Sequence, residues 1–139
     1  MKNKILLIAL IISGITTSLI FSACKHGNDA HTPPLLVFKT DSGYVSHDTT
    51  LTIGDTITVG LTATKTEDEL KTFNVSVAFD GAATSTTVSN TALSVPQYDS
   101  YSKDVVIGTR TVTGTEKYSF TVTDMDGNIT TKTLTITVN

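Results

Sequence analysis

The sequence predicts an all-β fold in which two antiparallel sheets pack face to face as a sandwich. From residue 35 onward, short runs rich in β-branched and aromatic residues are separated by turn residues. In at least four of these runs apolar and polar residues alternate, which is typical of strands with one buried and one wet face. This part of the sequence is rich in Thr and shows no helical periodicity. A closed barrel is the alternative arrangement of such strands.

The first half of this region provides four expected strands. Residues 35–38 form the first, and residues 51–53 form a short second one. Apolar and polar side chains alternate through residues 57–64 and again through residues 73–79, so both segments are expected to be half-buried strands. The acidic residues 66–69 between them are expected to form an exposed turn.

The second half adds three or four more strands. One or two weaker strands are expected within residues 84–95, which end at Pro96 because proline cannot donate to a ladder. Residues 105–107 form a compact apolar strand, and alternation returns in residues 118–123 and 133–138.

The inward-facing residues of these strands define an expected core. The chain has a single Cys, so it cannot form an internal disulfide, and it has no Trp. Its stability therefore depends on burying apolar surface, which contributes about 25 cal/mol per Å². The expected core residues are Phe38, Ile57, Val59, Leu61, Phe73, Val75, Val77, Phe79, Val105, Ile107, Tyr118, Phe120, Val122, Leu134, Ile136 and Val138.

The segment from Glu116 to Val138 resembles the closing strand pair of bacterial immunoglobulin-like and PKD-like modules. In these modules the first strand ends in a Tyr-x-Phe/Val-x-Val-x-Asp-x-Asp-Gly-Asn hairpin, and Tyr118 to Asn128 matches that pattern. Together with the number and spacing of the strands, the resemblance implies an immunoglobulin-like antiparallel β-sandwich of about seven strands. It implies little about function, since such modules serve as spacers, adhesins and supports for glycan binding. The disulfide and Trp of antibody domains are missing, as is the aromatic, glycine-rich loop of PKD domains.

The N-terminus has the layout of a secretory signal peptide. Lys2 and Lys4 precede a largely apolar run, which ends in small residues before Cys24. Phe21-Ser22-Ala23-Cys24 resembles the lipobox of bacterial lipoproteins, although Phe21 replaces the usual aliphatic residue. The resemblance implies cleavage before Cys24 and attachment of a diacylglyceryl thioether to its sulfur, usually with an N-acyl chain such as palmitate. An uncleaved transmembrane helix is the alternative, and either interpretation places the rest of the chain outside the cytoplasm.

The sequence therefore predicts three parts. Residues 1–23 form a lipoprotein signal peptide, residues 24–34 comprise the lipidated Cys24 and a flexible tether, and residues 35–139 form the sandwich domain. Lys25 stands where an Asp retains many bacterial lipoproteins in the inner membrane, which favours the outer membrane. Whether the domain faces the periplasm or the cell surface is left open.

The domain contains few candidate binding residues. Tyr98 and Tyr101 lie in an expected polar loop, where their rings could stack on a sugar or anchor a partner, or could fold back over the end of the sandwich. Asp124, Asp126 and Asn128 are a weak candidate Ca²⁺ site, since they offer oxygen ligands. An Asp-Gly pair between alternating strands favours a simple hairpin turn instead.

No enzymatic activity, cofactor or nucleic-acid partner is expected. The chain has a formal net charge of −3, its basic residues are scattered, and it lacks a Gly-x-Ser-x-Gly nucleophile elbow. The sequence predicts a non-enzymatic envelope lipoprotein that binds or scaffolds another envelope protein or a glycan. The alternatives are a Ca²⁺-stabilised adhesion module and an accessory subunit of a glycan-processing enzyme.

Overall fold

The computed structural model describes residues 31–139. The predictions for the signal peptide at 1–23, for the lipid on Cys24 and for the tether as far as residue 30 lie outside the described residues. The described residues form eight strands and no helix, so none of them belongs to a helix that could cross a membrane. The strands are β1 (Leu35–Phe38), β2 (Thr49–Leu51), β3 (Thr56–Thr64), β4 (Leu70–Phe79), β5 (Thr86–Ala92), β6 (Ser100–Gly108), β7 (Gly114–Asp124) and β8 (Ile129–Val138).

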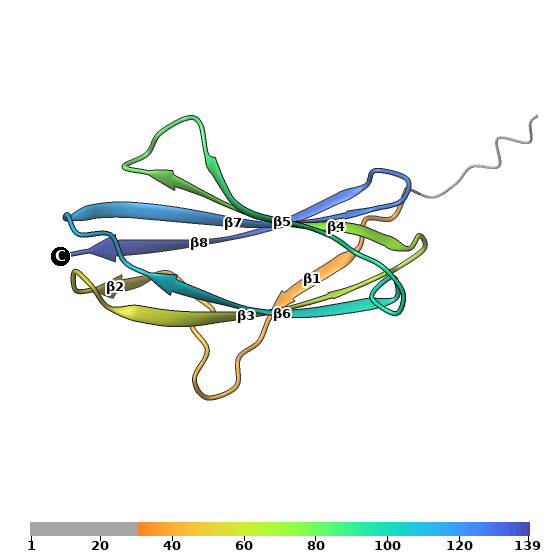
Figure 1. Cartoon of the computed structure of the whole chain (residues 1–139), viewed down its shortest axis with the longest axis horizontal. Helices are drawn as coiled ribbons and strands as arrows, with labels where there is room; N and C mark the ends of the chain where they lie inside the picture. The colour runs from red at the N-terminus through yellow and green to blue at the C-terminus, as the bar shows by residue number, and fades with distance from the viewer. Residues whose placement is uncertain (1–30) are drawn as a thin grey trace, which may run out of the picture.

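The strands form two layers that face each other (Figure 1). One sheet has three strands in the order β1-β3-β6, and the other has five in the order β2-β8-β7-β4-β5. All pairings are antiparallel except that of β2 with β8, which is parallel. The chain therefore leaves the first sheet after β1 and joins the edge of the second sheet through β2.

This strand order is that of an immunoglobulin-like sandwich. In that fold the first, second and fifth strands lie in one sheet, and the third, sixth and seventh lie in the other. Here β1, β3 and β6 take the first set of positions, and β4, β7 and β8 take the second. The predicted fold class is confirmed, with eight strands in place of about seven. The five-stranded sheet is wider than its partner, and β5 at its edge exposes nearly every residue on both faces.

The core lies between the sheets and is made by their inward-facing side chains. Most of the predicted core residues are buried, and Phe38, Ile57 and Val105 are partly buried against them. The prediction is wrong for Phe79, which is 41% exposed because it is the last residue of β4. The prediction omitted a further set of buried side chains, namely Leu36, Ala63, Leu70, Leu93 and Tyr101.

The segment between β1 and β2 crosses the outer face of β3 over a buried glycine. Gly60 lies beneath Lys39 and Tyr44, and a side chain at this position would collide with the Tyr44 ring. The Lys39 N–H donates to the Gly60 carbonyl at 2.8 Å. Lys39 and Tyr44 also donate to the two carboxylate oxygens of Asp104, at 2.7 and 3.0 Å, which holds the pKa of Asp104 below its usual range. The bare backbone of Gly60 thus lets the chain change sheets.

The two ends of the sandwich carry different loops. The described chain enters at one end, called here the N-terminal end, beside the turns at 65–69, 93–99 and 125–128. Asn139 lies at the other end, the C-terminal end, with the turns at 52–55, 80–85 and 109–113 (Figure 1).

Candidate functional site

Three loops are joined at the C-terminal end of the sandwich. Thr109, which follows β6 and is buried, connects the loop after β6 to the turn between β2 and β3. Its hydroxyl donates to the Thr52 carbonyl at 3.0 Å and accepts from the Gly54 N–H at 2.8 Å, while its own N–H donates to the Asp55 carbonyl at 2.9 Å. The turn and the loop therefore form one rigid unit.

Arg110 joins that unit to the loop after β4. Its guanidinium donates to both carboxylate oxygens of Asp80, at 2.7 Å from Nη1 and 2.5 Å from Nη2, and Nη2 also donates to the Thr113 carbonyl at 2.9 Å. Asp80 accepts a further hydrogen bond from the Thr115 N–H at 2.9 Å. The hydrogen bonds from Arg110 and then from Thr115 lower the pKa of Asp80 to about 2. Asp80 is therefore ionised at neutral pH.

A buried carboxylate lies beneath this ion pair. Glu116 is 1% exposed; its Oε1 accepts the Arg110 N–H at 2.8 Å, and its Oε2 accepts the Tyr118 hydroxyl at 3.0 Å. The Arg110 Nε lies 4.0 Å from Oε1 and has no hydrogen-bond partner within residues 31–139. Burial and the adjacent Glu116 raise the pKa of Tyr118 well above its usual range, so its hydroxyl stays protonated and donates. Both oxygens of Glu116 therefore accept hydrogen bonds at the start of β7.

Apolar side chains surround this network at the surface. Ile53, Phe79 and Val112 are 43%, 41% and 57% exposed, and the Arg110 guanidinium lies over the Phe79 ring at 5.5 Å. Arginine and aromatic residues carry much of the binding energy in protein interfaces. We call Ile53, Phe79, Arg110 and Val112 the C-terminal surface.

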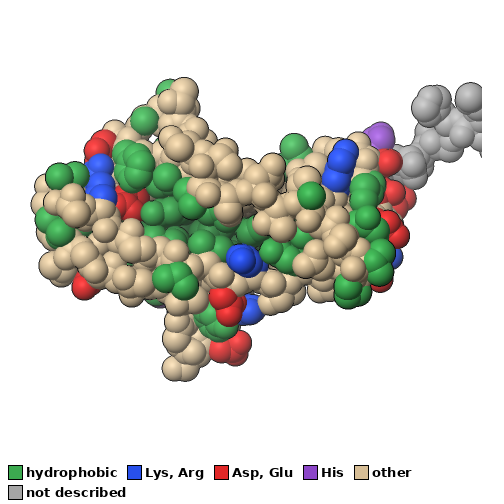
Figure 2. All heavy atoms as spheres, in the orientation of Figure 1, with side chains coloured by type: hydrophobic (Ala, Val, Ile, Leu, Met, Phe, Trp, Pro, Cys, Tyr) green, Lys and Arg blue, Asp and Glu red, His purple; other side chains and the backbone are tan. Residues whose placement is uncertain are grey.

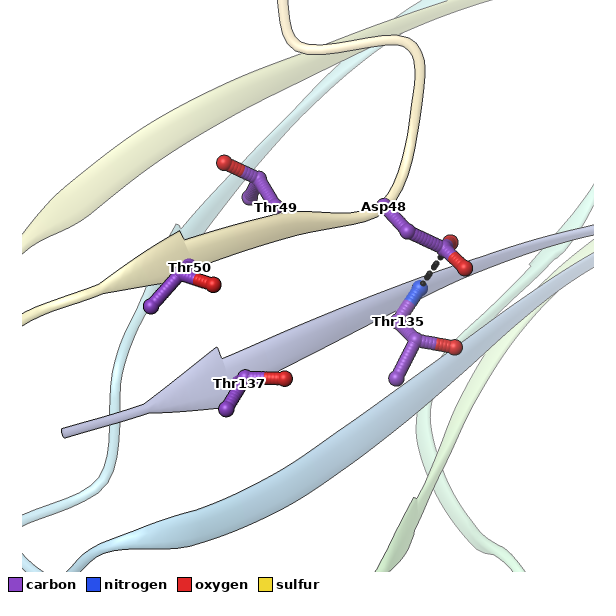
Figure 3. A pocket seen from close by; sticks show the side chains of 5 residues that line it. All are labelled: Asp48, Thr49, Thr50, Thr135 and Thr137. Carbon is purple, nitrogen blue, oxygen red and sulfur yellow. Dashed lines mark hydrogen bonds between the residues drawn. The ribbon is translucent and has the colours of Figure 1, made fainter.

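A polar hollow lies at the β2 edge of the five-stranded sheet, beside the parallel pair of β2 and β8 (Figure 3). It has a volume of about 400 Å³ and is lined by Asp48, Thr49, Thr50, Thr135 and Thr137. The Thr135 N–H donates to Asp48 Oδ1 at 2.8 Å, as Figure 3 shows. Four hydroxyls and one carboxylate give the hollow a donor and acceptor set that suits a polyhydroxylated ligand.

The structure separates the two tyrosines that the sequence singled out. Tyr98 is half-buried in the turn before β6, and its carbonyl accepts the Leu70 N–H at 2.8 Å. Tyr101 lies within β6, where it is 8% exposed and its ring centroid is 5.5 Å from that of Phe73. The predicted loop position of Tyr101 is wrong, because its register opposite the small Ala63 turns the ring into the core. Binding of a ligand by Tyr98 stays a prediction.

The acidic cluster near the end of β7 forms a hairpin turn. Asp124 is buried; its Oδ1 accepts the Asn128 N–H at 2.8 Å and its Oδ2 accepts the Asn128 side-chain amide at 3.0 Å. Gly127 supplies a positive φ of 92°, while Asp126 is exposed. Because the turn itself occupies both oxygens of Asp124, the geometry favours the turn over the Ca²⁺ site. Residues 31–139 contain no group of three or more His, Cys, Asp or Glu side chains that could hold a metal.

Sequence reasoning missed the charged network at the C-terminal end. Two signals were present: Arg110 is the only arginine, and Glu116 continues the inward alternation of Tyr118 and Phe120. An acid at an inward position of a strand requires buried donors. The partnership of Arg110 with Asp80 left no local signal, because these residues are 30 positions apart.

Comparison with known proteins does not place the chain in a family. No family model matches it, and no curated protein does. Similar solved structures include a β-glucosidase from Listeria innocua in complex with glucose, with a TM-score of 0.40 and 13% identity over 75% of this chain. They also include murine CRIg, with a TM-score of 0.40 and 15% identity over 78% of this chain and 99% of that one. This chain spans 16% of the β-glucosidase. At these TM-scores the fold assignment rests on the strand order and register described above.

Proposed function

We propose that this protein is a lipid-anchored, non-enzymatic binding module of a bacterial cell envelope, which holds another envelope protein close to the outer membrane. The lipidated residue is Cys24, in the pattern Phe21-Ser22-Ala23-Cys24. The binding role is supported by the immunoglobulin-like sandwich, whose interior is filled by its own side chains.

The observation that carries this proposal is the way the chain enters the sandwich. The Thr66 hydroxyl donates to the carbonyls of Thr32 and Pro33 at 2.8 and 3.0 Å, and the Thr130 hydroxyl donates to the Pro34 carbonyl at 2.5 Å. Residues 32–34 are therefore fixed to the N-terminal end, which leaves residues 25–31 between the proposed anchor and this fixed part of the chain. An extended segment of this length reaches about 25 Å, so the lipid holds the N-terminal end near the bilayer.

The C-terminal surface is our proposed site for the protein partner. It lies at the opposite end of the sandwich from residues 32–34. Its apolar side chains Ile53, Phe79 and Val112 are exposed, and the hydrogen bonds of Arg110 fix its loops in advance. Such preordering reduces the entropy that is lost on binding.

Photocrosslinking in intact cells tests the site. A photoreactive amino acid at Val112 is expected to capture one envelope protein, whereas the same amino acid at Val106 is not. Val106 is a suitable control because it is 68% exposed, against 57% for Val112. It lies on the outer face of the three-stranded sheet, in β6. Equal capture at both positions, or none at Val112, would remove the C-terminal surface from consideration.

The anchor has a separate test. Cells given a labelled fatty acid are expected to incorporate it into the unsubstituted protein and not into the Cys24→Ser variant. The mass of the mature N-terminus identifies the cleavage site. An unmodified thiol on Cys24 would contradict the proposal of anchoring without affecting the crosslinking result.

The hollow beside β2 supports glycan binding as a second candidate function. The specific observation is its lining of four Thr hydroxyls and the Asp48 carboxylate. Asp48→Asn keeps an acceptor for the Thr135 N–H and removes only the charge. If the hollow binds glycans, this variant is expected to lose signal on an array of envelope glycans, whereas the exposed-site variant Asp126→Asn is not. Equal signals would exclude the hollow as the glycan site.

A further inference from the structure

Four large apolar side chains are exposed at the N-terminal end. Val95, Ile129, Leu35 and Met125 are 77%, 58%, 54% and 41% exposed, and Val95 has the highest exposure among the large hydrophobic residues described. We call these four residues the entry surface. Figure 2 shows hydrophobic side chains at this end of the molecule, next to acidic ones.

Hydrogen bonds between the turns hold the entry surface together. The Met125 N–H donates to the Glu69 carbonyl at 2.8 Å, and the Leu70 N–H donates to the Tyr98 carbonyl at 2.8 Å. The turns that carry Val95 and Met125 are thus both fixed to the segment between β3 and β4. The bond from the Thr130 hydroxyl to the Pro34 carbonyl brings their sequence neighbours Ile129 and Leu35 to the same end of the sandwich. The apolar side chains therefore share one preformed end of the molecule.

The chemistry of this end suits the boundary between lipid and water. The segment from Gly81 to Tyr98 contains no charged residue, and Tyr98 is half-buried in the same turn as Val95. Tyrosine and apolar side chains are enriched where proteins meet that boundary. Exposed acids flank the surface, namely Glu67, Glu69 and Asp126. A carboxylate is compatible with zwitterionic headgroups, but anionic lipids repel it.

We propose that the entry surface rests on the bilayer that holds the lipid anchor, and that it prefers a zwitterionic surface. This inference rests on the proposed attachment of lipid to Cys24. Because residues 32–34 are fixed to the same end, the anchor keeps the entry surface within about 25 Å of the bilayer. At such a high effective concentration, even a weak apolar contact stays populated.

A single-tryptophan experiment tests this contact, since the chain has no native Trp. The lipidated full chain is reconstituted in phosphatidylcholine vesicles that contain a brominated lipid. Fluorescence of the Val95→Trp variant is expected to shift to the blue and to be quenched by the bromine. Val112→Trp, on the C-terminal surface, is expected to show neither change. The two positions are matched in being exposed valines in loops at opposite ends of the sandwich.

Lipid composition and charge provide a second readout. Replacing part of the phosphatidylcholine with phosphatidylglycerol is expected to reduce the quenching of Val95→Trp at low salt, and added salt is expected to restore it. Ile129→Asp introduced into the Val95→Trp variant is expected to abolish the quenching. Val106→Asp, on the outer face of β6, is expected to leave it unchanged.

The outcomes separate this inference from the proposed function. A lipidated chain, verified by mass, in which Val95→Trp is not quenched overturns the membrane contact and leaves the anchor intact. Equal quenching of Val95→Trp and Val112→Trp also overturns it, since the domain would then have no preferred end. A chain whose mass shows no lipid overturns both.

Discussion

At the C-terminal end of the sandwich the loops are joined by a partly buried charged network, whereas at the N-terminal end most of the joining groups are neutral and the ion pair of Lys65 with Asp99 is exposed. Asp80, Arg110 and the buried Glu116 link the loops around the start of β7. At the other end, Asp124 accepts from the backbone and amide of Asn128, and Thr hydroxyls donate to the carbonyls of the entering chain. Each end therefore contains a buried acid, but only Glu116 lies beside a cation.

The difference separates two ways of fixing loops. The charged network connects residues that are far apart in sequence, such as Asp80 and Arg110, and leaves apolar side chains exposed around it. The Asp124 turn is local, since its partner is four residues away. Substitutions should therefore affect the two ends by different amounts and under different conditions.

The largest effect is expected for Glu116→Ala. This substitution leaves the Arg110 N–H and the Tyr118 hydroxyl without their acceptor in a buried site, so we expect a loss of about 3 kcal/mol in the free energy of unfolding. Urea denaturation measures it. Glu116→Gln keeps an acceptor and is expected to lose less, and Glu67→Ala, at an exposed acid, is expected to stay within about 0.5 kcal/mol of the unsubstituted protein. A loss below about 1 kcal/mol for Glu116→Ala would contradict this account of the C-terminal end.

A smaller effect is expected at the N-terminal end for Asp124→Ala. The variant removes the acceptor of two hydrogen bonds from Asn128 in a half-buried turn, for an expected loss of about 2 kcal/mol. The matched variant Asp126→Ala, in the same turn but exposed, is expected to change stability by less than about 0.5 kcal/mol.

The thermal midpoint of the unsubstituted protein is expected not to rise when Ca²⁺ is added, and a clear rise would favour the Ca²⁺ site over the turn.

Acid is expected to weaken the C-terminal end selectively. The pKa of Asp80 is about 2 in the folded protein, against an ordinary value of 3.8, so the unfolded chain binds the proton more readily. The stabilising contribution of the Asp80 carboxylate is therefore complete above pH 3.8 and is lost as the pH falls toward about 2. Thermal midpoints of the Asp80→Asn variant are expected to fall less steeply over this range than those of the unsubstituted protein. Parallel curves would show that the ion pair with Arg110 does not contribute.

The smallest effect is expected for the ion pair at the N-terminal end. The side chains of Lys65 and Asp99 are 39% and 70% exposed, so solvent screens their attraction. Lys65→Ala is expected to leave the urea midpoint unchanged at both low and high salt. A salt-dependent decrease would show that charge matters at this end too.

Strand alternation predicted most of the fold, because a half-buried strand shows its two faces directly in sequence. It predicted β3 and β4 closely, since each presents an unbroken series of apolar residues to the core. It predicted only the apolar parts of β7 and β8, because polar residues occupy the start of each strand. It predicted only the end of β6, because Lys103 occupies an inward register position opposite Leu61 and interrupts the series. Of the one or two strands expected within residues 84–95, one is present as β5, and Leu93 is buried after that strand has ended.

The candidate sites were harder to predict, because they depend on which loops meet. The C-terminal surface joins Ile53 and Val112 from two loops with Phe79 from the end of β4, and only the strand order brings these together. The hollow depends on the parallel pairing of β2 with β8, which the sequence does not indicate. Tyr101 shows the converse: polar neighbours suggested a loop, but the pairing with Ala63 placed its ring in the core.

The parallel pairing of β2 with β8 also has a mechanical consequence. Residues 32–34 and the C-terminal surface lie at opposite ends of the sandwich, so a pull between the proposed anchor and the proposed partner would act along the strands. The pairs from Thr49 with Ile136 to Leu51 with Val138 would then be loaded in shear, all at once, instead of opening one after another as in a zipper. A domain built in this way would resist extension by a partner bound at its C-terminal end.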